Sequence, residues 1–365
     1  MTRLAPAFVV LMALAGCSTV APVVAAPVAD AAAMRAEAEF QQEASLDRLR
    51  QQDGRVAAVS FRLNVANLEL CPDKALLTGM ALHHALQYGL DSRPVARRHF
   101  GLGGRPSVLT VAPDSPAARA GVMVGDTLVA VDGTDFATIA DRDLDHRAPT
   151  YDETARARDL LDRALADGVG SLTVERAGQR LTLTIRPVPG CAYEAQLTPS
   201  EEVSAGADGR RIVITTAFVR YATTDDELAV VLGHELGHNV MKHRARIAGG
   251  GAAGAILGNA GAWPGGLLTV EREADYVGLY LMARAGYDYA AARDFWRQYG
   301  ADFGLSRYAQ GSHPGSLERA ANIAATAEEI RRKQAAGEPL VPTPARLTSA
   351  GTAGQAPTQS PDGRN

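Results

Sequence analysis

The chain has 365 residues, of which 46% are apolar and 21% charged, and its 37 basic and 41 acidic side chains leave a net charge of −4. These are globular proportions, which exclude a wholly disordered or fibrous protein, and the length predicts about two domains with additional tails. A charge so close to zero also argues against a nucleic-acid partner, because such partners usually need a strongly basic face.

The N-terminus has the pattern of a bacterial lipoprotein leader. Arg3 precedes an apolar stretch, Leu4 to Ala15, which is shorter than the ~20 helical residues that span a bilayer but suits a signal-peptide core. It ends in a Leu-Ala-Gly-Cys string that resembles a lipobox, where Cys17 is acylated and becomes the first mature residue. An ordinary secretory signal with a coincidental cysteine is the alternative. Because Ser18 is not the inner-membrane retention residue Asp, we predict a leader over residues 1–16 and a lipoprotein at the periplasmic face of the outer membrane.

The segment after the leader predicts a tether and then the first part of a folded body. Residues 17–33 form an Ala/Pro/Val-rich tether, and residues 34–97 begin the body. The predicted elements are, in chain order, a polar helix over 31–52 ended by Asp53-Gly54, a strand-like segment over 55–70 and a helix over 75–88. Cys71 and Cys191 predict a disulfide, because an oxidising compartment favours pairing. Two buried free thiols are the alternative.

Residues 98–189 have strand and turn signals of their own. Ser107–Val111 predicts a strand, Ser115–Gly121 a short helix with a glycine stop, and Glu153–Ala166 a helix with apolar periodicity. The string SPAARAGVMVGDTLVAVDG resembles a PDZ domain of the bacterial protease-associated type. The termini of such a domain lie close together, so it can be inserted into a loop of another domain. We therefore expect the disulfide to tie the two halves of that other domain together.

The PDZ resemblance also implies a peptide-binding site. Its carboxylate-binding loop would be formed by Gly101, Leu102, Gly103 and Gly104. Small residues there let backbone N–H groups converge on the C-terminus of a peptide, while the peptide adds as a strand beside Ser107–Val111.

The strongest local signal is the string His234-Glu235-Leu236-Gly237-His238. Thr224 and Glu227 form a capping-box pattern before it, which indicates that the string lies on a helix. Residues four apart share one helix face, so both imidazoles can reach one tetrahedral Zn²⁺. Glu235, one step around the helix, can take a proton from a water molecule at the metal.

A third metal ligand is needed, and Glu271 is the better of two candidates. His243 lies nine residues after His234, on the opposite face if the helix continues. Glu271 opens the string EREAD, which is predicted to begin a further helix. On that helix Glu271 and Asp275 share a face, while Glu273 would point away. Asp275 can then accept a hydrogen bond from a ligand imidazole and fix its tautomer. A surface acidic helix start is the alternative for this string.

Three strings together carry a family resemblance. HELGH, EREAD and His313-Pro-Gly-Ser-Leu-Glu-Arg319 resemble the HtpX-like and CAAX-prenyl-endopeptidase family of gluzincin zinc metalloproteases, of the periplasmic BepA-like and LoiP-like type. The resemblance implies one zinc ion on His234, His238 and Glu271, with Glu235 as general base and Asp275 beside a ligand imidazole. It places His313 and Arg319 near the active site, His313 to stabilise the oxyanion and Arg319 to orient it or the substrate.

The resemblance sets the expected fold and boundaries. We expect an α+β protein, with a mainly helical gluzincin domain and small sheet over residues 190–335, interrupted by the β-rich PDZ domain and followed by a disordered tail over 336–365. Arg211–Phe218 resembles the family's edge strand, where an extended substrate pairs by backbone hydrogen bonds. Ala248–Val270 is uncharged and is expected to form a mobile loop over the zinc cleft, with a membrane span as the alternative.

The expected function is zinc-dependent cleavage of unfolded or extended cell-envelope proteins, in quality control of misassembled outer-membrane and periplasmic proteins. The PDZ domain would recognise exposed C-termini, and the outer-membrane assembly machinery is an expected partner. A periplasmic chaperone or scaffold that acts through the PDZ domain with little proteolysis is the alternative. A further hypothesis is latency, in which His313 occupies the fourth zinc position until substrate arrives.

Overall fold

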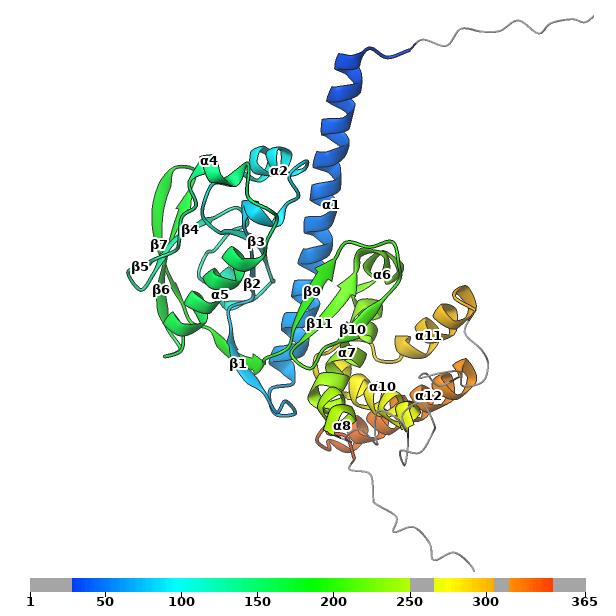
Figure 1. The fold of residues 1–365 in the computed structure, drawn as a ribbon. Helices are drawn as coiled ribbons and strands as arrows, with labels where there is room; N and C mark the ends of the chain where they lie inside the picture. Colours follow the sequence, from blue (N-terminus) through cyan, green and yellow to red (C-terminus); the bar gives the residue numbers. More distant parts are fainter. Residues whose placement is uncertain (1–27, 250–265, 305–314, 344–365) are drawn as a thin grey trace, which may run out of the picture. The chain divides into compact units, whose positions relative to one another are not determined.

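The computed structural model describes residues 28–249, 266–304 and 315–343, which Figure 1 draws as a coloured ribbon. By its internal contacts the chain divides after Gln41, and the unit that starts at Gln42 holds all the strands and all the helices after the first. This unit combines helices with several small sheets, which confirms the predicted α+β class. The predicted leader over 1–16, Cys17 and most of the predicted tether lie outside the described residues.

A single long helix, α1 (Ala31–Ala66), replaces the predicted helix, break and strand-like segment. Gly54 does not end it, although a glycine inside a helix costs about 1 kcal/mol. The prediction was wrong because Val56, Val59 and Leu63 share one helix face and are buried in the main core. Each such burial stabilises the fold by about 1.5–3 kcal/mol, so packing outweighs the local propensity.

An antiparallel sheet with the strand order β2-β3-β4-β6-β7 forms the PDZ region. Its strands are β2 (Met80–His83), β3 (Ser107–Val111), β4 (Thr127–Val131), β6 (Gly170–Arg176) and β7 (Gln179–Ile185), with β5 (Thr134–Asp135) beside β4. The helices of this region are η1 (Ala85–Gln87), α2 (Arg93–Phe100), α3 (Pro116–Arg119), α4 (Asp141–Leu144) and α5 (Asp152–Ala164). Ala157 and Leu161 of α5 pack with Leu128 and Leu172 of the sheet in one buried cluster.

Strand β2 lies within the segment predicted to be a helix over 75–88, and that prediction was wrong. Gly79 precedes β2 with φ +73°, a left-handed conformation that ends regular structure. A Cβ at this position would lie 2.3 Å from the Cβ of Ser115, so the chain also needs glycine here for close approach. The PDZ sheet therefore takes in a strand that precedes the predicted boundary at residue 98.

Two links join the chain on either side of the PDZ region. Cys71 and Cys191 form the predicted disulfide, with Cα atoms 5.4 Å apart. Directly beside it, β1 (Lys74–Leu77) pairs antiparallel with β8 (Val188–Cys191). Both sulfur-bearing residues are buried in the main core, so the disulfide is part of that core.

A three-stranded sheet with the order β10-β11-β9 and a group of helices form the remaining part. The strands are β9 (Glu194–Thr198), β10 (Ala205–Ala207) and β11 (Arg211–Thr215), and the helices are α6 (Thr216–Tyr221), α7 (Asp225–Val240), α8 (His243–Gly249), α10 (Gly266–Arg284), α11 (Ala291–Asp302) and α12 (Ser316–Ala336). The main core lies between α1, this sheet and these helices.

The predicted edge strand over 211–218 is not an edge strand. β11 is the central strand of its sheet, and it ends at Thr215, whose hydroxyl accepts a hydrogen bond from the Phe218 N–H and caps α6. The preceding residues form β10 and a turn in which the Gly209 N–H donates to Asn239 of α7. β10 is thus the edge strand on that side of the sheet.

The C-terminal segment stays attached beyond α12. The Lys333 ammonium donates to the Val341 carbonyl, and the Thr343 hydroxyl donates to Glu329. The expected disorder from residue 336 therefore does not apply to residues 337–343. No helix among the described residues is long and apolar enough to cross a membrane, and most of the segment 248–270 lies outside them.

Candidate metal centre

Helix α7 carries both histidines of the HELGH string on one face. Its N-terminus has the predicted capping box, in which the Thr224 hydroxyl accepts from the Glu227 N–H and the Glu227 carboxylate accepts from the Thr224 N–H. The helix then runs without a break to Val240, so His234 and His238 are one turn apart. Their Nε2 atoms lie 3.1 Å from each other.

Glu271 of helix α10 completes a cluster of three metal-donor atoms. One carboxylate oxygen lies 3.4 Å from the His234 Nε2 and the other 3.6 Å from the His238 Nε2. Donors about 2.0–2.1 Å from a tetrahedral zinc ion lie about 3.3 Å from each other. The spacing of these three side chains therefore fits a divalent metal ion, and among the described residues they are the one such group.

Small residues let the two helices approach closely enough for this geometry. A Cβ on Gly278 of α10 would lie 3.0 Å from the backbone of Gly233 and from the His234 backbone nitrogen on α7. One turn further along, a Cβ on Gly237 would lie 2.9 Å from the Ala274 carbonyl oxygen. The glycine inside the HELGH string thus serves the helix crossing that brings the Glu271 carboxylate to the imidazoles.

Asp275 and Arg319 orient one of the ligand imidazoles. The Asp275 carboxylate lies 2.8 Å from the His234 Nδ1, as predicted, and it accepts two hydrogen bonds from Arg319, at 2.6 and 2.9 Å. Burial opposes the ionisation of Asp275, but Arg319 and His234 outweigh it and lower its pKa to about 2. The Arg319 guanidinium also stacks on Trp296, 3.3 Å from the ring centroid.

The charges around the cluster suit a bound cation and a proton acceptor. Burial opposes protonation of His234, but the Asp275 and Glu271 carboxylates outweigh it and raise the pKa of this imidazole to about 10. A positive charge is therefore stabilised at this point. Burial raises the pKa of Glu235, which moves this carboxyl toward the range in which a general base works near neutral pH.

Comparison with known proteins agrees with this geometry. Residues 174–263 and 268–327 match the model of Peptidase family M48, and residues 107–146 match a PDZ domain. The chain contains an M48 peptidase domain. It is 32% identical over 149 residues to the mitochondrial metalloendopeptidase OMA1 of Arabidopsis thaliana and 31% identical over 136 residues to that of Schizosaccharomyces pombe.

These similarities cover only part of each protein. The two matches span 35% and 32% of this chain, and 31% and 40% of the relatives. A solved structure of the HtrA-type protease AlgW with a decapeptide is similar over 32% of this chain and 30% of its own, at 24% identity and a TM-score of 0.21. That structural likeness is too slight to carry an argument.

Of the two residues His313 and Arg319, which were predicted near the active site, the structure describes only Arg319. Arg319 lies in the first turn of α12, where it donates to Asp275, and its Nη2 also lies 3.3 Å from the His234 Nδ1. His313 lies outside the described residues, and its predicted roles at the oxyanion and the fourth metal position stay predictions.

The sequence reasoning missed two residues at the second ligand. His243 was expected on the opposite face of α7, and Glu273 was expected to point away. Because α7 ends at Val240 and Lys242 adopts φ +54°, the chain turns and the His243 ring lies 2.8 Å, Nδ1 to Nδ1, from His238. Glu273 then lies 3.1 Å from the His243 Nε2. A count of helical turns cannot foresee a left-handed residue after the helix end.

Three other histidines make contacts elsewhere in the fold. His83 is buried and its Nδ1 lies 2.8 Å from the Tyr88 hydroxyl, and the side chain of His84 caps η1. His99 lies 3.0 Å from Asp47.

The predicted carboxylate-binding loop of the PDZ region does not have the expected form. The N–H groups of Gly101 and Leu102 both donate to the Arg97 carbonyl, where they cap the C-terminus of α2. Gly104 lies against Ile139, whose N–H donates to the Gly104 carbonyl. Strand β3, beside which a peptide was expected, is paired on both sides. The N–H groups of Gly101 and Leu102 are thus used at a helix end, and the peptide-binding role of the loop stays a prediction.

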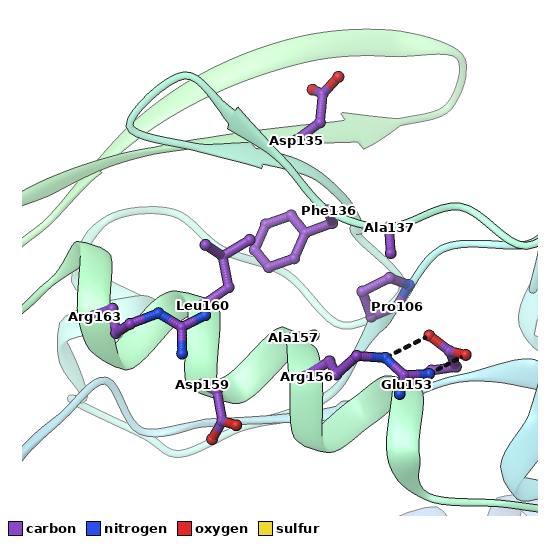
Figure 2. Close-up of a pocket in the computed structure, with 10 residues that line it drawn as sticks. All are labelled: Pro106, Asp135, Phe136, Ala137, Glu153, Arg156, Ala157, Asp159, Leu160 and Arg163. Carbon is purple, nitrogen blue, oxygen red and sulfur yellow. Dashed lines mark hydrogen bonds and ion pairs between the residues drawn. The ribbon is translucent and has the colours of Figure 1, made fainter.

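A cavity of about 400 Å³ lies in the PDZ region between α5 and the segment that follows β5 (Figure 2). Phe136 and Leu160 supply apolar surface, and Glu153 pairs with Arg156 at one end. None of the metal-donor residues lines it, so it is separate from the candidate metal centre.

Proposed function

We propose that the protein is a zinc metalloendopeptidase that cleaves unfolded or extended cell-envelope proteins. The observation that carries this proposal is the cluster of His234, His238 and Glu271, beside the buried carboxyl of Glu235. Two imidazoles and one carboxylate are the donor set of many catalytic zinc sites, which leave a fourth position open. A zinc ion bound there would polarise the scissile carbonyl and acidify a water molecule.

The side chains divide the remaining work between them. Glu235 accepts the proton of the attacking water and passes it to the leaving amine, a task that its raised pKa supports. Asp275 holds the His234 ring in the tautomer whose Nε2 lone pair faces the metal position, and Arg319 holds Asp275 ionised. The edge strand β10 offers backbone groups with which an extended substrate would pair.

We propose that the PDZ region recognises substrates along β2. This strand is at the edge of its sheet, and Leu82 on it shares a buried cluster with Ala157 of α5. A peptide that added to this edge would therefore lie beside α5. Binding of a fluorescent peptide with a free C-terminus, but not of its C-terminal amide, would support recognition of C-termini. Equal binding of both peptides would refute it.

We also propose that the protein is a lipoprotein at the periplasmic face of the outer membrane. The lipobox-like string before Cys17 and the disulfide, which is typical of oxidising compartments, support this. Metabolic labelling with a fatty acid, followed by membrane fractionation, tests it. Cys17→Ala should lose the label and leave the outer membrane. A variant that keeps both would contradict the proposal.

Proteolysis itself is tested with a reduced and alkylated model protein as substrate. We expect zinc-loaded protein to cleave it, a chelator to abolish cleavage and added zinc to restore it. Stable capture of the substrate without cleavage at full zinc occupancy would instead favour a chaperone or scaffold that acts through the PDZ region. Comparison of protein fragments between wild-type cells and cells with Glu235→Gln would then identify the natural substrates in envelope quality control.

A further inference from the structure

A continuous chain of hydrogen bonds leads from the second ligand imidazole to a carboxylate. The His238 Nδ1 lies 2.8 Å from the His243 Nδ1, and the His243 Nε2 lies 3.1 Å from a Glu273 carboxylate oxygen. Arg246 donates to the same oxygen at 2.7 Å. The His243 side chain is only 2% exposed, so bulk water does not compete for these contacts.

The three side chains are consistent with a single arrangement of protons. The His238 Nε2 faces the metal donors, so it must carry the lone pair when a metal is bound, and its Nδ1 then carries the hydrogen. That N–H donates to the His243 Nδ1, which leaves the His243 Nε2 as a donor. The ionised Glu273 is the acceptor that such a donor needs.

The other histidine donor, His234, has a similar chain of contacts, but without the added imidazole. His234 meets the carboxylate of Asp275 directly, and an arginine, Arg319, holds that carboxylate. His238 meets the carboxylate of Glu273 through His243, and Arg246 holds that one. Glu271, Glu273 and Asp275 alternate along α10. Glu271 is a metal donor, and the other two accept hydrogen bonds from the chains of contacts at the two histidine donors.

We propose that His243 and Glu273 are a positioning pair for the metal ligand His238, which fixes its tautomer and ring orientation. The proposal rests on the zinc-binding function proposed above, and neither residue touches the metal position itself. Residues that orient a metal-ligating imidazole typically contribute 10- to 100-fold to metal affinity. Loss of His243 should therefore weaken zinc binding while the three donors stay in place.

Zinc affinity, measured by competition with a chelator, tests this independently of proteolysis. The measurement uses the full chain with Glu235→Gln, which removes cleavage. We expect His243→Ala to weaken zinc binding about 10- to 100-fold, and Glu273→Gln about 10-fold. His243→Asn should recover most of the loss, because its amide oxygen can replace Nδ1 as the acceptor. His83→Ala removes another buried imidazole, in the PDZ region, and should leave zinc affinity unchanged.

Each outcome decides between the proposals. Zinc affinities of His243→Ala and Glu273→Gln within twofold of the parent would overturn the positioning role. An equal loss in His243→Ala and His243→Asn would overturn it too, because the acceptor would then be irrelevant. If His243→Ala does not fold, as circular dichroism would show, the partly exposed Glu273→Gln still decides the question. A parent protein that binds no zinc would refute the proposed function instead.

Discussion

Removal of the Cys71–Cys191 disulfide should destabilise the protein strongly. The bond closes a loop over a sequence separation of 120 residues that contains the whole PDZ sheet. The chain-entropy model gives about 5 kcal/mol at 25 °C for a loop of this length. Because measured contributions of disulfides often fall below this model value, we expect a loss of about 3–5 kcal/mol in the double variant Cys71→Ser/Cys191→Ser.

Urea denaturation followed by circular dichroism measures this loss. The wild-type protein should lose about the same stability when a reductant is added, whereas the double variant should not respond to the reductant. A difference below about 1 kcal/mol between the oxidised wild type and the double variant would refute the reasoning. It would mean that the unfolded chain gains little freedom when the loop opens.

Three further changes test the fold that positions the site. Burial raises the pKa of Asp53 to about 7, so this carboxyl favours folding while protonated, and stability should fall as the pH rises from about 4 to 7. Asp53→Asn should therefore stabilise the protein by about 2–4 kcal/mol at pH 8, and should have little effect on its stability at pH 4. Urea denaturation at both pH values measures this difference. Thr224→Ala removes the cap of α7 and should cost about 1 kcal/mol in urea denaturation, whereas Thr224→Ser should not. Gly278→Ala inserts a methyl group between α7 and α10 and should cost about 1–3 kcal/mol and weaken zinc binding in a chelator titration. Unchanged zinc affinity would contradict the role of this crossing.

Local patterns predicted the elements that carry the metal donors. The capping box at Thr224 marks the start of α7, and the EREAD string places Glu271 and Asp275 one turn apart on α10. Each of these patterns reports contacts within one or two helical turns. They identify the donors, although only the folded chain shows that small residues at Gly233 and Gly278 bring the two helices together.

The errors occurred where tertiary contacts override local preference. Gly54 is typical of a helix end, but α1 continues through it because Val56, Val59 and Leu63 are buried in the main core. The count of helical turns placed His243 on the wrong face, because the left-handed conformation of Lys242 cannot be inferred from such a count. The segment 101–104 resembles a peptide-binding loop, and only the contacts of the Gly101 and Leu102 N–H groups reveal a helix cap.

The central claim is tested most directly by cleavage of an unfolded substrate by wild-type protein and by Glu235→Gln, each with one zinc ion per chain. Glu235 is buried and is not one of the three metal donors, so the substitution removes the proton acceptor without removing a donor atom. We predict equal zinc affinity and a loss of at least about 100-fold in the cleavage rate. Full cleavage by the zinc-loaded Glu235→Gln protein would contradict the account.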